Sequence, residues 1–203
     1  MSTYLELQQR IASDYLNRTD YTNEVKRSIL AAVRHYERRR WRFNETISDL
    51  AASAGQTFLT LPSNFLVLDR LEVVADGDRW SLNERSLDYI RDRQDTSATN
   101  APTDYHLRSN RIELADVPDS AYSCPCYYIK TLSELSADAD SNSWTTGAMQ
   151  DVIVYHATKL MWANVIRNSQ EAIKYAALEK ESLSVITSEN EQFSHAYIRP
   201  TQF

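Results

Sequence analysis

The chain has 203 residues, a formal net charge of −6 at pH 7 and a sequence pI of about 5.3, so the whole molecule is not expected to be drawn to nucleic acid. No apolar run approaches the roughly 20 residues that span a bilayer, no secretory leader opens the sequence, and Cys124 and Cys126 give no disulfide framework. We therefore expect a soluble protein made in the cytoplasm, without a membrane segment, built as one ordinary domain or a domain with an insertion.

Two helices are predicted in the first 44 residues. Residues 2–17 place several apolar side chains near one helical face. Over Val25–Tyr36, apolar residues recur at spacings of three and four, which is the pattern of an amphipathic helix. This second helix is expected to start at an N-cap at Asp20 or Thr22 and to run to about Trp41.

After Asn44 the sequence becomes rich in branched and aromatic residues, which predicts a sheet of four to six short strands. The predicted strands are residues 57–61, 65–75, 80–82, 105–107, 111–114 and 122–132. Asp76-Gly77-Asp78 is typical of a hairpin turn. Ser86 is expected to cap a short helix that ends near Arg93.

Helical periodicity returns at Ala148 and predicts one helix ending near Arg167 and another from about Ser169 to Phe193. Because Asn168-Ser169 permits only a tight turn, these two helices should be antiparallel neighbours.

We therefore predict a mainly α fold with a β insertion (α+β), in which an antiparallel helical bundle carries a small β-rich subdomain between helices 2 and 3. The bundle is expected over residues 1–44 and 147–193, and the insertion over residues 45–146. Residues 194–203, which contain a proline and no periodicity, are expected to form an extended docking tail.

No set of residues makes a convincing active site. Cys124 and Cys126 have no second pair of zinc ligands, and are better explained as two small residues on a strand. Asp138 and Asp140 resemble the start of a calcium loop, but its later glycine and glutamate are missing, so turn chemistry explains them better. His156 lies on an apolar helix face and is interpreted as a hydrogen-bonded packing residue. We predict no catalytic residue, no cofactor and no metal.

Five arginines surround one tryptophan near the end of the second predicted helix. They are Arg34, Arg38, Arg39, Arg40, Trp41 and Arg42. Cations are favourable at a helix C-terminus, but five exceed that need. Arginine and tryptophan together favour a protein interface. A solvated face and a nucleic-acid contact are the alternatives.

The last predicted helix carries an acidic surface, formed by Glu171, Glu179, Glu181, Glu189 and Glu191. A basic and an acidic patch on one subunit can meet between neighbours, head to tail, and close a ring. An ordinary salt-bridged helix face explains the same residues.

Two further segments suggest contacts. The polar segment Leu132–Thr146 contains a lone tryptophan, Trp144, which is expected to anchor it under the start of the third predicted helix or under a neighbouring subunit. The apolar side chains of the tail would be costly to expose to water unless a partner covers them. The tail is therefore interpreted as a docking peptide. Its proposed contact residues are Tyr197, Ile198, Arg199, Pro200 and Phe203.

Several segments resemble the head-to-tail adaptor (connector) proteins of tailed bacteriophages, most closely those of the short-tailed type. They include TYLELQQRIASDYLNRTD, VKRSILAAVRHYERRRWRFNE, AGQTFLTLPSNFLVLDRLEV, RSLDYI and LSADADSNSWTTGAMQDVIVYHA. These segments follow the expected order and cover nearly the whole chain. The resemblance therefore concerns the protein as a whole.

The resemblance implies a structural virion protein at the head-tail junction, assembled as a ring of about twelve copies. One end would bind the portal protein through Tyr197–Phe203, and the other would receive tail or nozzle proteins. Genomic DNA would pass through the acidic ring without specific binding. The arginine cluster would lie at a subunit or portal contact. The rival functions are a peptidoglycan-degrading tail enzyme and a nucleic-acid-binding module.

Overall fold

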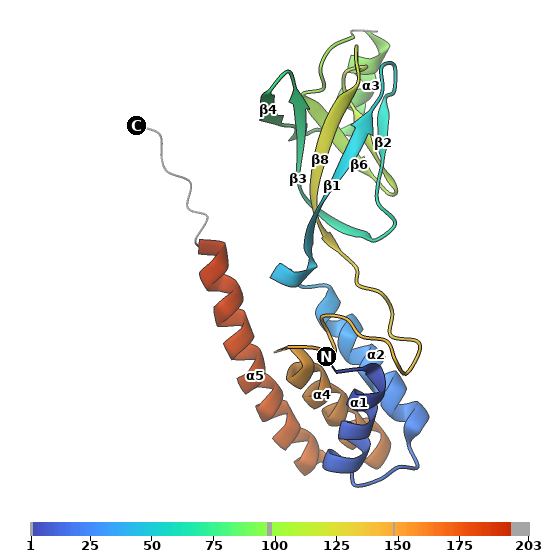
Figure 1. Cartoon of the computed structure of the whole chain (residues 1–203), viewed down its shortest axis with the longest axis vertical. Helices are drawn as coiled ribbons and strands as arrows, with labels where there is room; N and C mark the ends of the chain where they lie inside the picture. The colour runs from blue at the N-terminus through green and yellow to red at the C-terminus, as the bar shows by residue number, and fades with distance from the viewer. Residues whose placement is uncertain (1, 97–98, 148, 196–203) are drawn as a thin grey trace. The chain divides into compact units, whose positions relative to one another are not determined.

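The computed structural model describes residues 2–96, 99–147 and 149–195. The chain divides into two compact units. We call Met1–Phe43 with Leu132–Phe203 the helical unit, and Asn44–Thr131 the β unit (Figure 1). The β unit is continuous in sequence, whereas the helical unit is made of segments from both sides of it.

The helical unit is built from three longer helices and several short helical segments (Figure 1). These are α1 (Tyr4–Gln9), the π-helical η1 (Arg10–Tyr15), α2 (Thr22–Glu37), α4 (Met149–Leu160), the π-helical η3 (Met161–Ile166) and α5 (Ser169–His195), with the 3-10 turn η2 (Arg42–Asn44) after α2. Helix α4 packs against both α2 and α5. No helix in the described part of the chain is both long enough and apolar enough to span a bilayer.

Local sequence explains where these helices begin and end. Thr3 and Glu6 form a capping box that starts α1. Helix α2 ends at Glu37, four residues before the predicted end at Trp41, because the backbone carbonyl of Tyr36 accepts hydrogen bonds from the Arg39 amide and from the Trp41 indole. The predicted N-cap of α2 is wrong, because Tyr21 occupies that position without a side-chain cap.

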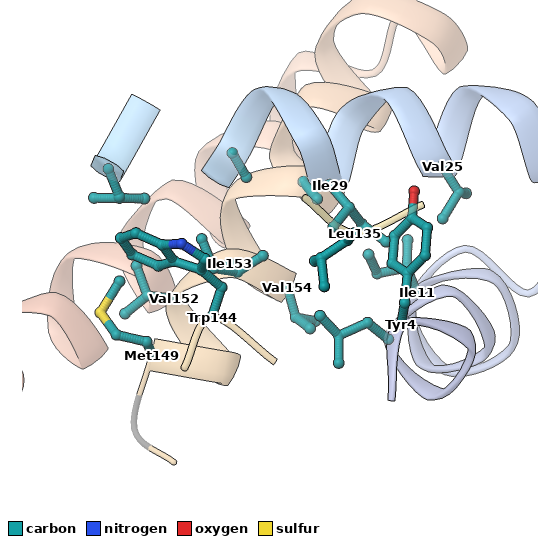
Figure 2. Close-up of a cluster of buried hydrophobic side chains, with 14 of the residues drawn as sticks. Tyr4, Ile11, Val25, Ile29, Leu135, Trp144, Met149, Val152, Ile153 and Val154 are labelled. Carbon is teal, nitrogen blue, oxygen red and sulfur yellow. The ribbon is translucent and has the colours of Figure 1, made fainter. Parts of the chain in front are cut away.

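The core of the helical unit joins residues that are far apart in sequence. Tyr4, Ile29, Trp144 and Ile153 are almost completely buried and belong to one cluster (Figure 2). Burying side chains of this size gives the largest favourable contribution to folding, about 1.5–3 kcal/mol for each aliphatic residue. The first helix, the polar segment before α4 and α4 itself are therefore held by one core.

The described residues of the β unit form eight strands in two four-stranded sheets (Figure 1). The strands are β1 (Glu45–Ala52), β2 (Phe58–Thr60), β3 (Phe65–Ala75), β4 (Asp78–Ser81), β5 (Asn83–Glu84), β6 (Asp104–Arg108), β7 (Arg111–Leu114) and β8 (Tyr122–Lys130). Sheet A has the order β1-β8-β3-β4, and sheet B has the order β2-β7-β6-β5. All pairs are antiparallel except β5 with β6.

The inner faces of the two sheets enclose the core of the β unit. Leu71 lies opposite Cys126 in the register of sheet A, and both are fully buried, as are Ile112 and Leu114 of sheet B. Cys124 also points into this core. Burial raises the pKa of both thiols to about 11, so they stay protonated at neutral pH.

The short helix α3 (Leu87–Asp95) belongs to the β unit, and the predicted cap is confirmed, since the Ser86 hydroxyl accepts a hydrogen bond from the Tyr89 amide. At the other end, the Arg93 guanidinium lies 2.5 Å from the Asp116 carboxylate. The predicted turn is also confirmed: Asp76 and Gly77 both have positive φ, the backbone of a tight hairpin between β3 and β4.

The predicted fold is wrong in its architecture. The chain is α+β, but it is not a helical bundle with a small β-rich subdomain between helices 2 and 3. Eight strands form two sheets among the described residues, and the third α-helix in chain order, α3, lies among them with strands on both sides. The strand β1 was not predicted. Apolar and polar residues alternate too weakly in its sequence, ETISDLAA, to predict a strand. The reason is that β1 lies at the edge of sheet A, where most of its side chains stay partly exposed.

Candidate functional site

The arginine segment, which we define as Arg34–Arg42, covers the last turn of α2 and the chain that follows it. All five of its arginines are exposed. The Arg39 guanidinium lies 5.3 Å from the centre of the Tyr36 ring, and this cation–π contact holds it over the helix end. Arg34 and Arg38 form no ion pair with any residue that the structure describes. Their charges are therefore presented to solvent or to a partner.

Trp41 lies inside the helical unit, with an exposed fraction of 3%. Its indole donates a hydrogen bond of 2.8 Å to the Tyr36 carbonyl, and its ring stacks on Phe43 at an interplanar angle of 7°. The Phe43 ring meets Trp144 edge to face, with centroids 5.1 Å apart. The structure thus brings Trp41 and Trp144 into one aromatic cluster, where they fix the backbone next to the exposed arginines.

The strap, which we define as residues 132–146, contacts the N-terminus of helix α1. Trp144 and Leu135 are buried in the core (Figure 2). The backbone carbonyls of Asp138 and Asp140 accept hydrogen bonds from the amides of Leu5 and Tyr4, at 3.0 and 2.8 Å. The strap therefore satisfies two of the free amides at the N-terminus of α1.

The carboxylates of the strap also make local structural contacts. Asp138 accepts hydrogen bonds from Lys26 at 3.1 Å and from Gln8 at 3.3 Å. Asp140 accepts from the amides of Ser136 and Ala137, both at 2.7 Å. The hydrogen bond from Lys26 lowers the pKa of Asp138, and those backbone amides lower the pKa of Asp140. These hydrogen bonds within the strap and to the neighbouring helices give both acids a structural role. Because their pKa values are lowered, neither is a proton donor at neutral pH.

A polar network lies within the core of the helical unit. We call Tyr36, His156, Lys159 and Glu179 the Glu179 network. The Glu179 carboxylate, 8% exposed, accepts hydrogen bonds from the Tyr36 hydroxyl, from His156 Nδ1 at 2.7 Å and from Lys159 Nζ at 2.6 Å. The network joins α2, α4 and α5 at one carboxylate.

The hydrogen bonds in the network control its charge. Burial alone raises the pKa of Glu179, but the hydrogen bonds from His156, Lys159 and Tyr36 outweigh it and lower the pKa to about 2. Burial and the hydrogen bond to Glu179 raise the pKa of Tyr36. Glu179 therefore stays ionised, and Tyr36 stays protonated as a donor.

His35 lies beside the network and stacks on His156, with ring centroids 4.7 Å apart. Burial lowers the pKa of His35, and the charges of His156 and Arg39 lower it further. The packing role predicted for His156 is confirmed by its burial and its hydrogen bond to Glu179. The prediction that Glu179 belongs to an acidic surface is wrong, because this side chain faces the core.

Sequence reasoning missed the Glu179 network, although a signal was present. Glu179 falls four residues after Tyr175 and four before Leu183, within the apolar stripe of α5. An acid at that position must be paired, and His156 and Lys159 on the preceding helix are suitable partners.

Other predicted site residues fall elsewhere. Tyr197, Ile198, Arg199, Pro200 and Phe203 lie outside the described residues. Within the described ranges, no group of three or more histidine, cysteine or acidic side chains is arranged to hold a metal ion. The cysteines are core residues, and the strap acids belong to turns and caps. What the geometry does provide is an exposed basic segment at a helix end, beside the buried side chains of Trp41 and Trp144.

The chain matches the SU10 adaptor protein family over residues 2–200, and it therefore belongs to that family. This confirms the resemblance to phage head-to-tail adaptors and gives the chain a structural role as a virion component. Among curated proteins, none matches the chain.

Proposed function

We propose that the protein forms the adaptor ring at the head-tail junction of a phage, binding the portal protein on one side and tail or nozzle proteins on the other. The observation that carries this proposal is the family match over residues 2–200. A joint of this kind is held by many copies of a modest contact, so its strength comes from avidity.

The charge distribution supports the passage of DNA through the ring. The β unit contains fourteen acidic and eight basic residues, whereas the helical unit contains fourteen of each. The whole net charge of −6 therefore belongs to the β unit. A channel lined by acidic subunits repels phosphate, which lets the duplex slide without being clamped.

We also propose contacts for the arginine segment and for the tail. The exposed arginines of the arginine segment would pair with acidic groups of a neighbouring subunit or of the portal, held in place by Trp41 and Trp144. The tail Tyr197–Phe203, which combines aromatic residues with one arginine, would dock on the portal.

Electron microscopy and native mass spectrometry of the protein, alone and mixed with the portal of the same virus, test the proposal. We expect a ring of adaptor subunits on the portal. A monomer that ignores the portal would contradict it. Deleting Tyr197–Phe203 should abolish portal attachment while the circular dichroism spectrum stays unchanged. Full attachment of the truncated protein would remove the tail from the proposal.

Two assays separate the rival functions. An adaptor should leave a peptidoglycan suspension turbid and should not retard duplex DNA in a gel at 50 mM salt. Clearing of the suspension would indicate a lytic enzyme. Retardation that weakens steeply as salt rises would indicate a nucleic-acid-binding module.

A further inference from the structure

Two histidines from different helices of the helical unit lie ring against ring. His35 belongs to α2 and His156 to α4, and their rings stack with centroids 4.7 Å apart and an interplanar angle of 26°. His35 is exposed, whereas His156 is only 6% exposed. The Tyr36 ring meets His35 edge to face, with centroids 4.8 Å apart. The exposed imidazole therefore shields one side of the Glu179 network from water.

The stacked position has no acceptor to offer a charged imidazole. Histidine is the side chain whose charge ordinarily changes between pH 5 and 8, so His35 can gain a proton there. Both oxygens of the Glu179 carboxylate are already taken by the other members of the network. The His35 ring makes no hydrogen bond in the part of the chain that the structure describes. A proton on His35 would therefore add a charge without a partner.

The charges around His35 come from three helices. On α4, Lys159 Nζ lies 3.2 Å from Nδ1 of His156, the residue on which His35 stacks. On α2, Arg39 adds a guanidinium one turn further along, and Glu179 on α5 is the opposing negative charge. Burial lowers the pKa of His35, and the charges around it lower it further, with Glu179 offsetting only part of the effect. The stack therefore favours the neutral ring.

The end of α2 depends on the same network. Tyr36 follows His35 in the chain, and its hydroxyl donates a hydrogen bond to Glu179. The backbone carbonyl of Tyr36 accepts hydrogen bonds from the Trp41 indole at 2.8 Å and from the Arg39 amide at 3.0 Å. These two bonds hold the chain of the arginine segment against the helical unit. A displacement of Tyr36 would release that chain.

We propose that His35 is a proton-sensitive switch: in mild acid the charged ring leaves the stack, water reaches the Glu179 network, and the arginine segment loosens from the helical unit. The effect of this switch on binding rests on the proposed contact of the arginine segment with an acidic partner. The opening itself is a property of the isolated chain. A single proton thereby changes how the exposed arginines are presented.

The direction of the pH dependence follows from the lowered pKa. In an open end the His35 ring is free in water and has its ordinary pKa of 6.5, so the open end binds a proton more readily than the closed end. The closed state is therefore fully favoured above pH 6.5 and is lost as pH falls from there through the lowered pKa. The opening equilibrium shifts tenfold for each pH unit between the two pKa values.

Nuclear magnetic resonance of the full chain tests the switch without a partner. The His35 ring should titrate below pH 6.5, and its pKa should rise in Arg39→Gln, which removes a neighbouring cation. Between pH 7.5 and pH 5.5, the protection of the Trp41 indole proton from exchange, relative to free indole at each pH, should fall severalfold. In His35→Gln the protection should not change with pH. His106→Gln, a matched change in the β unit, should keep the native response.

His35→Lys provides the opposite test, because it places a permanent charge at the same position. At pH 7.5 its Trp41 indole should be as weakly protected as that of the native chain at pH 5.5. Circular dichroism of each variant separates local opening from loss of the fold. Attachment to the portal should weaken between pH 7.5 and pH 5.5 in the native chain, because a loosened segment must be ordered again on binding. It should not weaken in His35→Gln.

The possible outcomes are distinct. An ordinary pKa for His35 would overturn the switch. A parallel loss of protection in the native chain and in His35→Gln would also overturn it, because another group would then be responding. A full response of the isolated chain that leaves portal attachment unchanged would support the switch and remove the arginine segment from the proposed portal contact.

Discussion

In the helical unit one buried carboxylate, Glu179, takes its hydrogen bonds from side chains of two other helices. In the β unit four buried carboxylates, Glu72, Asp104, Glu113 and Asp116, each pair with at least one arginine. Glu179 is enclosed with its partners, whereas the arginines keep roughly half of their side-chain surface in water. The difference teaches that a buried acid can either join distant segments or complete a local surface pair.

Removing the central carboxylate should have the largest effect. Glu179→Ala leaves His156, Lys159 and Tyr36 without their common acceptor, so the free energy of unfolding should fall by about 3 kcal/mol. Denaturation followed by tryptophan fluorescence measures this loss. In a Trp80→Phe background, the three remaining tryptophans all lie in the helical unit.

The matched control is Glu181→Ala, an exposed acid two residues further along α5. Its effect should stay within about 0.5 kcal/mol. Equal losses for the two variants would show that Glu179 does not join the helices.

Acid should affect the same network. The pKa of Glu179 is about 2 in the folded chain against an ordinary 4.5, so its stabilising effect is complete above pH 4.5 and is lost as pH falls toward 2. The difference between the two values corresponds to about 3 kcal/mol. Comparing unfolding at pH 5 and pH 2.5 in the native chain and in Glu179→Gln isolates this contribution. If the two chains lose stability in parallel, Glu179 is not the group that responds.

A carboxylate of the β unit should matter less. In Glu72→Gln, water can solvate the guanidinium groups of Arg70 and Arg79, whose side chains are 43% and 56% exposed. We expect a loss of about 1 kcal/mol, because such pairs resemble surface salt bridges. Hydrogen exchange of the amides of β3 and β8 measures it. A loss as large as that of Glu179→Ala would remove the contrast between the units.

The smallest effect on stability is expected at the surface of the arginine segment. Arg38→Ala should change the free energy of unfolding by less than about 0.5 kcal/mol, since Arg38 has no ion partner among the described residues. Portal or neighbour binding of the same variant should weaken, most clearly at low salt. Unchanged binding would point to a solvated helix face.

The amphipathic helices were predictable because a single face of each is buried. The apolar residues of α2 and α5 recur at helical spacing, and both helices form close to the predicted positions. The long strand β3 was equally clear, since Phe65–Ala75 is rich in branched residues. These elements carry their own signal in consecutive residues.

The arrangement of the strands and the network around Glu179 depend on contacts between distant residues. The partition into two sheets is decided by pairings such as β1 with β8, which join residues about eighty positions apart. Strand β1 has no strong pattern of its own and forms because β8 provides its hydrogen bonds. Glu179 likewise resembled a surface acid until its partners on α2 and α4 were known.

The strap imposes an order on folding during synthesis. The first helix obtains two of its N-terminal hydrogen bonds from Asp138 and Asp140, which the ribosome adds only after the whole β unit. The β unit has all of its strands in one continuous stretch and can fold while the remaining helices are still being made. The first two helices should therefore wait, without a complete core, until α4 and α5 emerge.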